Sequence, residues 1–124
     1  MIVLTAKEEK LKEILLELEK NSEVTNSAII SLKGQMMASA LHNDVDGRAL
    51  SAMSAALQSV GTRVSDTLSA GTISSIVING DEKLVMVQQL SQALLVALAP
   101  SDAKIGLIDY EVSNALDKIK MVLG

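Results

Sequence analysis

The sequence predicts an α+β fold with the element order α-ββ-α-βββ-α, and three observations indicate it. Segments near both ends and in the middle carry apolar residues every three or four positions, as amphipathic helices do. Between them lie short apolar runs separated by turn residues such as Gly34 and Asn79-Gly80. Pro100, the only proline, closes the last run. We therefore expect a five-stranded antiparallel sheet with the long middle helix on one face and the N- and C-terminal helices on the other.

Length and composition point to one packed domain. The chain has 124 residues and a mass of 13.1 kDa, so we treat residues 1–124 as a single domain. Its 48% hydrophobic content argues against disorder. No apolar run approaches the roughly 20 residues of a membrane helix, and the N-terminus lacks the pattern of a signal peptide, so no membrane insertion is expected.

Charge and residue usage exclude several functional classes. A net charge of −4 and a single aromatic residue, Tyr110, argue against nucleic-acid binding. The absence of cysteine excludes disulfides and thiolate metal sites and fits a reducing cytoplasm, where we expect the protein to act. The chain contains no glycine-rich phosphate loop, so we expect no nucleotide and no other cofactor.

The first helix is predicted from its cap. Thr5-Ala6-Lys7-Glu8 has the pattern of a capping box, with Thr5 as the N-cap. The apolar face that follows comprises Leu11, Ile14, Leu15 and Leu18. Asn21-Ser22 is expected to end the helix.

Two short apolar runs around a glycine predict a β-hairpin. Residues 28–32 and 35–41 flank Lys33-Gly34, and Gly34 can take the positive φ that a tight turn requires. Residues 42–45 are a polar connection. Either Asn43 or Asp46 can then cap the long helix.

The long helix, predicted over Asp46–Ser69 with Gly71 just past its end, carries three stripes. We expect a large apolar stripe to pack on the sheet: Leu50, Met53, Leu57, Val60, Val64 and Leu68. A small stripe would let a second helix approach closely: Ala49, Ala52, Ala56, Ser59, Arg63 and Thr67. The alternative is that this small stripe packs on the chain's own sheet. A polar stripe is expected to face solvent and to dock a partner: Ser51, Ser54, Gln58, Thr62 and Ser65.

Three further strands and a helix complete the chain. Strands are predicted over residues 72–78, 84–90 and 93–99, with the turn Asn79–Glu82 after the first. The second and third strands are apolar at successive positions, which predicts that both of their faces are covered. Ser101 or Asp102 is expected to cap the last helix. Its apolar stripe comprises Ile105, Ile108, Val112, Leu116, Ile119 and Leu123.

Candidate catalytic and metal-binding residues are few. Residues 42–47 resemble the start of a calcium loop, but an EF-hand begins with an acid and needs glutamate where Met53 stands. We therefore interpret them as a polar turn and a helix cap. Asn79–Glu82 has two interpretations, a turn or a site for a cation or basic partner. With no nucleophile, paired base or metal cluster in the pattern, we expect no enzymatic activity and no metal.

The two arginines, Arg48 and Arg63, have two interpretations. Each could stabilise a phosphoryl transition state on another protein, as an arginine finger does. Each could also form an ordinary ion pair at a surface or an interface, which we favour.

Three segments in this order resemble the Roadblock family, which comprises the roadblock-type dynein light chains and their prokaryotic relatives. Residues 28–34 resemble the family's first strand and glycine turn, although Lys33 stands where an acidic residue is common. Residues 50–57 resemble its alanine-rich second helix. Residues 95–98 and 104–106 resemble its last strand and the start of its third helix. The resemblance extends from about Ala6 to Val122.

This resemblance implies a homodimer, or a heterodimer with a similar chain, in which the second helices pack side by side and the third strands pair edge to edge. The interface residues would be Ala49, Ala52, Ala56, Ser59, Arg63, Thr72, Ser74 and Ile76. It also implies a small Ras-like GTPase as the partner, which the dimer would regulate or bind as a platform. A scaffold that bridges proteins without altering nucleotide turnover is the alternative. No catalytic residue is implied.

Overall fold

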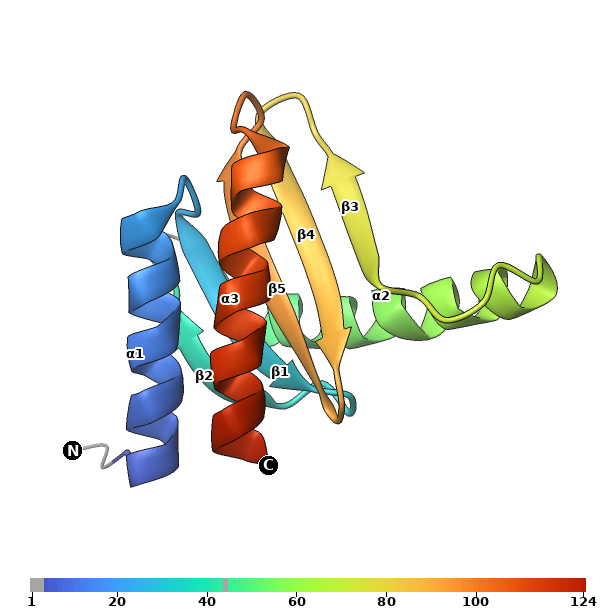
Figure 1. Cartoon of the computed structure of the whole chain (residues 1–124). Helices are drawn as coiled ribbons and strands as arrows, with labels where there is room; N and C mark the ends of the chain where they lie inside the picture. The colour runs from blue at the N-terminus through green and yellow to red at the C-terminus, as the bar shows by residue number, and fades with distance from the viewer. Residues whose placement is uncertain (1–3, 44) are drawn as a thin grey trace.

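The computed structural model describes residues 4–43 and 45–124 (Figure 1). Their secondary structure runs α1 (Ala6–Asn21), β1 (Asn26–Ser31), β2 (Met36–Ala40), α2 (Gly47–Thr67), β3 (Ser75–Asn79), β4 (Lys83–Leu90), β5 (Ala93–Pro100) and α3 (Ile105–Leu123). This order confirms the predicted α-ββ-α-βββ-α fold. Residues 1–3, part of the segment compared with a signal peptide, and Asp44 of the calcium-loop pattern lie outside the described residues.

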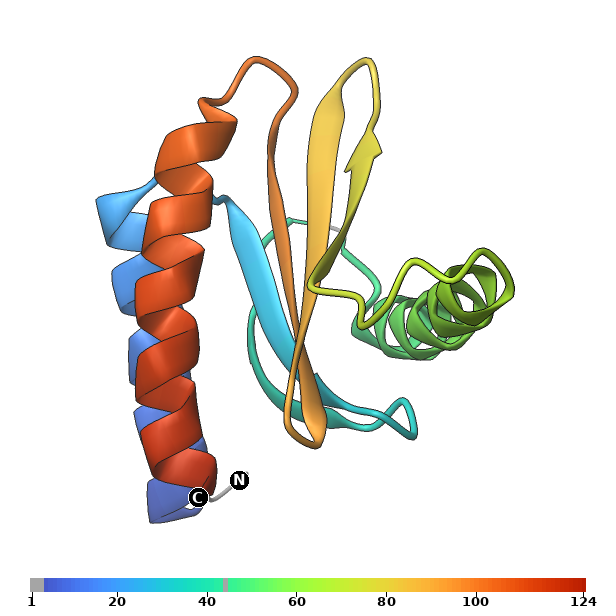
Figure 2. The ribbon, with the colours of Figure 1, turned by 45° about the vertical axis from the view of Figure 1, so that its right-hand side comes forward.

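The five strands form one antiparallel sheet in the order β2-β1-β5-β4-β3. α1 and α3 cover one face of this sheet and α2 lies against the other, as predicted (Figure 2). The central strand, β5, is covered on both faces. Its Leu95 and Ala97 belong to the apolar cluster under α1 and α3, and its Leu94 and Val96 belong to the cluster under α2. This explains why β5 is apolar at successive positions.

The cluster under α1 and α3 is the main core, and the helix periodicity predicted it well. Thr5 Oγ1 accepts a hydrogen bond from the Glu8 N–H at 3.1 Å, so Thr5 is the N-cap of α1. All four predicted apolar residues of α1 are buried: Leu11, Ile14, Leu15 and Leu18. The buried residues of α3 are Ile108, Val112, Ala115 and Ile119.

The start of α3 differs from the prediction. Its N-cap is Lys104, and no side chain caps it, so neither Ser101 nor Asp102 has the predicted role. The reason is a turn after the last strand, in which the Ala103 N–H donates to the Pro100 carbonyl at 3.0 Å. Ser101 and Asp102 lie inside that turn. The helix therefore begins later than predicted, and Ile105 in its first turn remains exposed.

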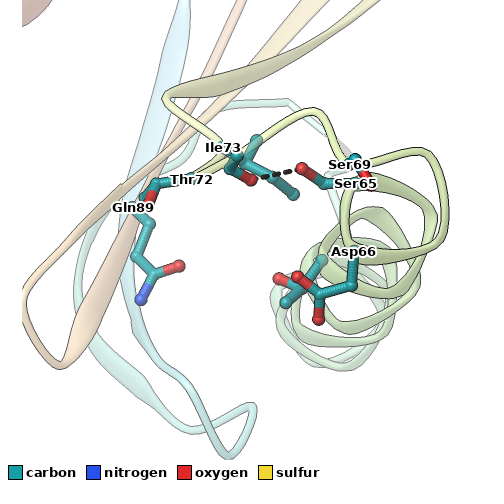
Figure 3. A pocket seen from close by; sticks show the side chains of 8 residues that line it. Ser65, Asp66, Ser69, Thr72, Ile73 and Gln89 are labelled. Atoms are coloured by element: carbon teal, nitrogen blue, oxygen red, sulfur yellow. Dashed lines mark hydrogen bonds between the residues drawn. The ribbon is translucent and has the colours of Figure 1, made fainter.

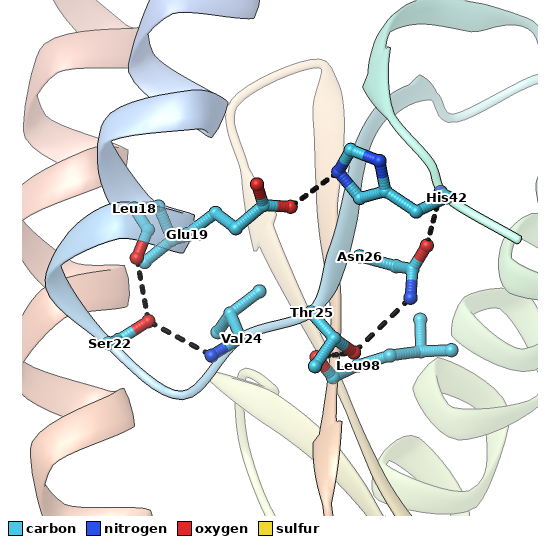
Figure 4. A network of polar contacts seen from close by, with 8 residues as sticks. All are labelled: Leu18, Glu19, Ser22, Val24, Thr25, Asn26, His42 and Leu98. Carbon is cyan, nitrogen blue, oxygen red and sulfur yellow. Dashed lines mark hydrogen bonds and ion pairs between the residues drawn. The ribbon is translucent and has the colours of Figure 1, made fainter.

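A polar network ties the end of α1 to the segment that leads into α2 (Figure 4). Asn26 Oδ1 accepts from the His42 N–H at 2.6 Å, and the His42 ring lies 2.6 Å from Glu19 Oε1. Ser22 Oγ donates to the Leu18 carbonyl and accepts from the Val24 N–H. The side chain of His42 is therefore a half-exposed partner of Glu19, which fits the interpretation of this loop as a connection.

Both ends of α2 are closed by local hydrogen bonds. Asp46 is the N-cap, and its carboxylate accepts from the Arg48 and Ala49 N–H groups at 3.1 and 3.2 Å. At the other end, the Ala70 N–H donates to the Ser65 carbonyl and Ser69 adopts a left-handed φ of 54°. This arrangement is a Schellman motif, which stops the helix two residues before the predicted end.

Asp46→Ala is expected to lower the free energy of unfolding by about 0.5–2 kcal/mol, because two N–H groups at the start of α2 lose their acceptor. Urea denaturation at one fixed protein concentration measures the change. Asp46→Asn keeps an acceptor oxygen and is expected to retain most of the stability. Asp66→Ala, on the same helix, is the matched control. Equal losses for the Ala and Asn variants would contradict the role of Asp46 as a cap.

Candidate functional site

The side of α2 that packs on the sheet is not the side that the sequence predicts. The polar stripe, expected in solvent, is buried against the sheet at Ser51, Ser54, Gln58 and Ser65; of its five members only Thr62 is exposed. The large apolar stripe, expected to be buried, is exposed at Val60, Val64, Met53 (62%) and Leu68 (72%). Only its Leu50 and Leu57 are packed, half-buried, beside the sheet. Both predictions for these stripes were wrong.

Two physical reasons explain this orientation. First, small side chains let α2 approach closely: a Cβ placed on Gly34 would lie 3.6 Å from Ser51 O, and one on Gly61 would lie 2.8 Å from Ile76 Cδ1. Second, the hydroxyl groups of Ser51 and Ser65 find acceptors within the chain, which lowers the cost of burying them. Ser51 Oγ donates to the Gly47 carbonyl at 2.8 Å, and Ser65 Oγ donates to the Gly71 carbonyl.

The surface of α2 that faces away from the sheet is apolar and open. Ala52 and Ala56 are exposed, so the small stripe does not pack on the chain's own sheet. We define the outer α2 face as the exposed residues Ala52, Met53, Ala56, Val60, Arg63, Val64 and Leu68. A groove of about 420 Å³ lies along it, next to Val60, Val64 and Leu68. The last turns of α2 extend past the edge of the sheet, so this end of the helix does not lie over a strand (Figure 1).

The strand next to this helix has an unpaired edge. β3 is the last strand of the sheet and pairs only with β4, in a register without irregularity from Ser75 to Asn79. Its Val77 and Ile78 side chains are exposed. The opposite edge strand, β2, has a register shift against β1 near Met37, a bulge of the kind that protects an edge from pairing. β3 is therefore the better template for another strand.

β3 is shorter than the strand predicted over residues 72–78. Thr72 and Ser74 precede the strand, and only Ile76 of the three predicted interface residues lies within it, half-buried against α2. The cause is the Ser65 hydrogen bond to Gly71, which holds the connecting segment against the helix. The chain reaches the sheet only at Ser75, opposite Gln88.

A polar hollow of about 520 Å³ lies between the end of α2 and the sheet (Figure 3). Figure 3 shows Gln89 on the sheet side, and Ser65 and Asp66 on the helix side. Hydroxyl groups dominate its lining, and its one ionisable side chain is the carboxylate of Asp66. In residues 4–43 and 45–124 no group of three or more His, Asp or Glu residues is placed to hold a metal ion. None of the helices described is both long and apolar enough to span a bilayer.

The remaining candidate residues lie apart. Asn79–Glu82 forms an exposed turn in which the Gly80 N–H donates to the Lys83 carbonyl at 3.0 Å, as the turn interpretation predicts. Arg48 and Arg63 are both exposed on α2. The ion pairs within the described part of the chain are His42–Glu19 and Lys118–Glu17, so neither arginine is paired there.

The geometry therefore describes a candidate interaction surface: an apolar helix face and an open strand edge. Sequence periodicity identified the small residues of this surface but assigned the neighbouring large ones to the core. The missed residues are Met53, Val60, Val64, Leu68, Val77 and Ile78. One signal in the sequence could have found those that belong to the helix. α2 has two apolar stripes side by side, more apolar surface than a single sheet covers.

Comparisons with known proteins agree with this fold. The family model described as Roadblock/LC7 domain matches residues 10–99. An uncharacterized protein of Methanocaldococcus jannaschii is 29% identical over 107 residues, which cover 86% of this chain and 94% of that protein. The structure of MglB from Myxococcus xanthus superposes with a TM-score of 0.89 at 14% identity, covering 99% of this chain and 94% of that one. The gliding protein MglB from Thermus thermophilus gives 0.87 at 17% identity, covering 98% and 94%. At these identities the structural matches establish the fold alone.

Proposed function

The chain belongs to the Roadblock/LC7 domain family, and from this membership we propose that it is a dimeric module that binds and regulates a small Ras-like GTPase. We propose no catalytic residue and no cofactor for the chain itself. We also propose that the protein is located in the cytoplasm, because GTP and the GTPases that hydrolyse it are found there.

The observation that carries the proposal is the outer α2 face. Its exposed Met53, Val60 and Val64 adjoin small residues, so a second α2 lying antiparallel across Ala52 and Ala56 would cover apolar surface without a steric clash. The open edge of β3 supports the same arrangement, since two such edges can continue one sheet across a two-fold axis. A Roadblock-like chain of different sequence could take the place of the second copy.

A GTPase partner is proposed from the family resemblance. The similar MglB of Thermus thermophilus is described as a gliding protein, and an MglB structure with a tetrameric arrangement is also similar to this chain. We expect regulation to act through conformation. A module that binds the hydrolysis-competent form of the GTPase more tightly than the inactive form raises its population and hence the rate. The arginine-finger role is not part of the proposal.

Single-turnover hydrolysis of GTP by the Ras-like GTPase encoded nearest to this gene tests the regulatory role. With this protein in excess, we expect the rate to change by about tenfold or more, equivalent to roughly 1.4 kcal/mol in activation free energy. The matched control is the Ala56→Glu chain, which is expected not to dimerise. Firm binding with an unchanged rate would contradict regulation and leave the scaffold alternative. Lack of binding would contradict the choice of partner.

A further inference from the structure

The side of α3 that faces away from the sheet carries a row of exposed residues. This row, which we call the outer α3 stripe, comprises Leu107, Tyr110, Asn114, Asp117 and Met121. Tyr110 is 63% exposed and Met121 is 85% exposed, which is unusual for side chains of this size and polarity. α3 lies on the opposite side of the sheet from α2, so the stripe is separate from the outer α2 face (Figure 2).

The spacing of the outer α3 stripe is that of a contact between two helices. Its members follow one another at intervals of three, four, three and four residues, which is the heptad spacing of helices that pack side by side. The core-facing residues of the same helix are a different set: Ile108, Val112, Ala115 and Ile119. α3 therefore has one face for its own core and, on its back, a second stripe that fits another helix.

The residues of the stripe match those of a second α3 that runs in the opposite direction. In an antiparallel pair centred between Asn114 and Asp117, Tyr110 lies opposite Met121 of the second copy, and Asn114 lies opposite Asp117. A thioether sulfur makes favourable contacts with an aromatic ring, and an amide N–H donates to a carboxylate. A two-fold axis repeats both contacts, so each of these four residues meets a suitable partner.

Charge also favours the antiparallel direction. Glu111 and Lys118 flank the stripe on one side, seven residues apart, and an antiparallel pair brings the acidic residue of each copy to the basic residue of the other. Lys118 Nζ lies 2.8 Å from Glu17 Oε1, but an ammonium group has three donors and can serve a second carboxylate. A parallel pair would instead place Asp117 against Asp117 of the second copy, where like charges repel.

We propose that the outer α3 stripe binds a second copy of this chain in an antiparallel contact between the two α3 helices. Two single helices bury less area than the roughly 1,200–2,000 Å² of stable complexes, so a dissociation constant of about 0.1–1 mM is expected. The contact goes beyond the proposed function and does not use the outer α2 face. It joins two α2 dimers where these form, or two single chains where Ala56→Glu prevents them. At micromolar concentration it is dissociated.

Disulfide cross-linking tests the contact and its direction, because the chain contains no cysteine of its own. Tyr110→Cys and Met121→Cys are made separately in the Ala56→Glu chain, mixed at about 0.5 mM and oxidised mildly. Disulfides need Cα atoms within about 7 Å, so the mixed disulfide is expected to form about tenfold faster than either homodimer. Asp109→Cys, exposed on α3 but outside the stripe, is the control and should not cross-link to Met121→Cys at this rate.

Each other outcome of the cross-linking contradicts the proposal. Faster homodimers than mixed dimers would indicate a parallel pair, and equal rates for all combinations, including Asp109→Cys, would indicate random collisions. The mixed disulfide reports the α3 contact whether or not the outer α2 face forms a dimer. Failure of the proposed α2 dimer and failure of the α3 contact are therefore distinguishable.

Sedimentation equilibrium of the Ala56→Glu chain at up to 1 mM measures the strength of the contact. Asp117→Lys is expected to weaken association about tenfold or more, because the new lysine meets the Asn114 amide and lies near Lys118 of the second copy. Asp102→Lys makes the same charge change in the exposed turn before α3 and should alter association by less than about twofold. Equal effects of the two variants, or a chain that stays monomeric at 1 mM, would overturn the proposal.

Discussion

An Ala56→Glu chain is expected to measure as a 13.1 kDa monomer in light scattering, whereas the unchanged chain is expected to measure at twice that mass. Ala56 is exposed on the outer α2 face, so glutamate at this position disturbs no contact within the chain. In the proposed dimer the same position faces a second α2, where a buried carboxylate without a partner is costly by several kcal/mol. Dimerisation should therefore be lost while the fold is kept.

Circular dichroism checks that the fold of the Ala56→Glu chain is retained. Ser113→Glu adds the same charge to an exposed position of α3, on the opposite side of the sheet, and is expected to remain dimeric. Ala52→Glu should act like Ala56→Glu. An unchanged chain that is already monomeric, or an Ala56→Glu chain that is still dimeric, would show that the outer α2 face is not the interface.

Leu15→Ala is expected to lower the free energy of unfolding by about 2–5 kcal/mol. Leu15 is fully buried, at 0% exposed, in the cluster between α1 and the sheet. Truncation removes its apolar contacts and leaves a cavity that a packed core closes only in part. For a domain of this size such a loss is a large fraction of the total stability.

The neighbouring residue is the control for this second prediction. Leu16 is 42% exposed on the same helix, so Leu16→Ala deletes the same atoms with an expected loss of less than about 1 kcal/mol. Urea denaturation is measured at one protein concentration, because the stability of a dimer depends on concentration. Losses of similar size for the two variants would contradict the assignment of Leu15 to the core.

The faces of α1 were predicted correctly because a single apolar stripe leaves one choice. Leu11, Leu15 and Leu18 are large and most of the rest of the helix is charged, so only one orientation buries this apolar surface. α2 differs, since it has several stripes and only one of them can be buried against the sheet. Ser51 and Gln58 could be buried because they find hydrogen-bond acceptors, and the larger Met53 was left outside. Hydrophobicity alone therefore predicts the wrong stripe of α2 to be buried.

Element ends were predicted less well than the elements themselves. Asp46 caps α2 as expected because the cap bonds its immediate neighbours. The caps proposed for α3 and the start of β3 failed for a different reason. Pro100 forms a turn with Ala103, and Gly71 is held by Ser65 on the helix, so both boundaries depend on hydrogen bonds that compete with the local pattern.

Local sequence patterns were enough to predict the element order, the cover of both faces of the sheet and the apolar faces of the terminal helices. These follow from local rules of spacing, turn residues and strand length. Which side of α2 packs on the sheet and which side stays open could be learned only from the folded chain. That choice depends on partners distant in the chain: Gln58 is buried because Gln89, 31 residues away, accepts its hydrogen bond. A periodic pattern records which residues share a face, but the free energy of burying that face is set by what the fold brings against it.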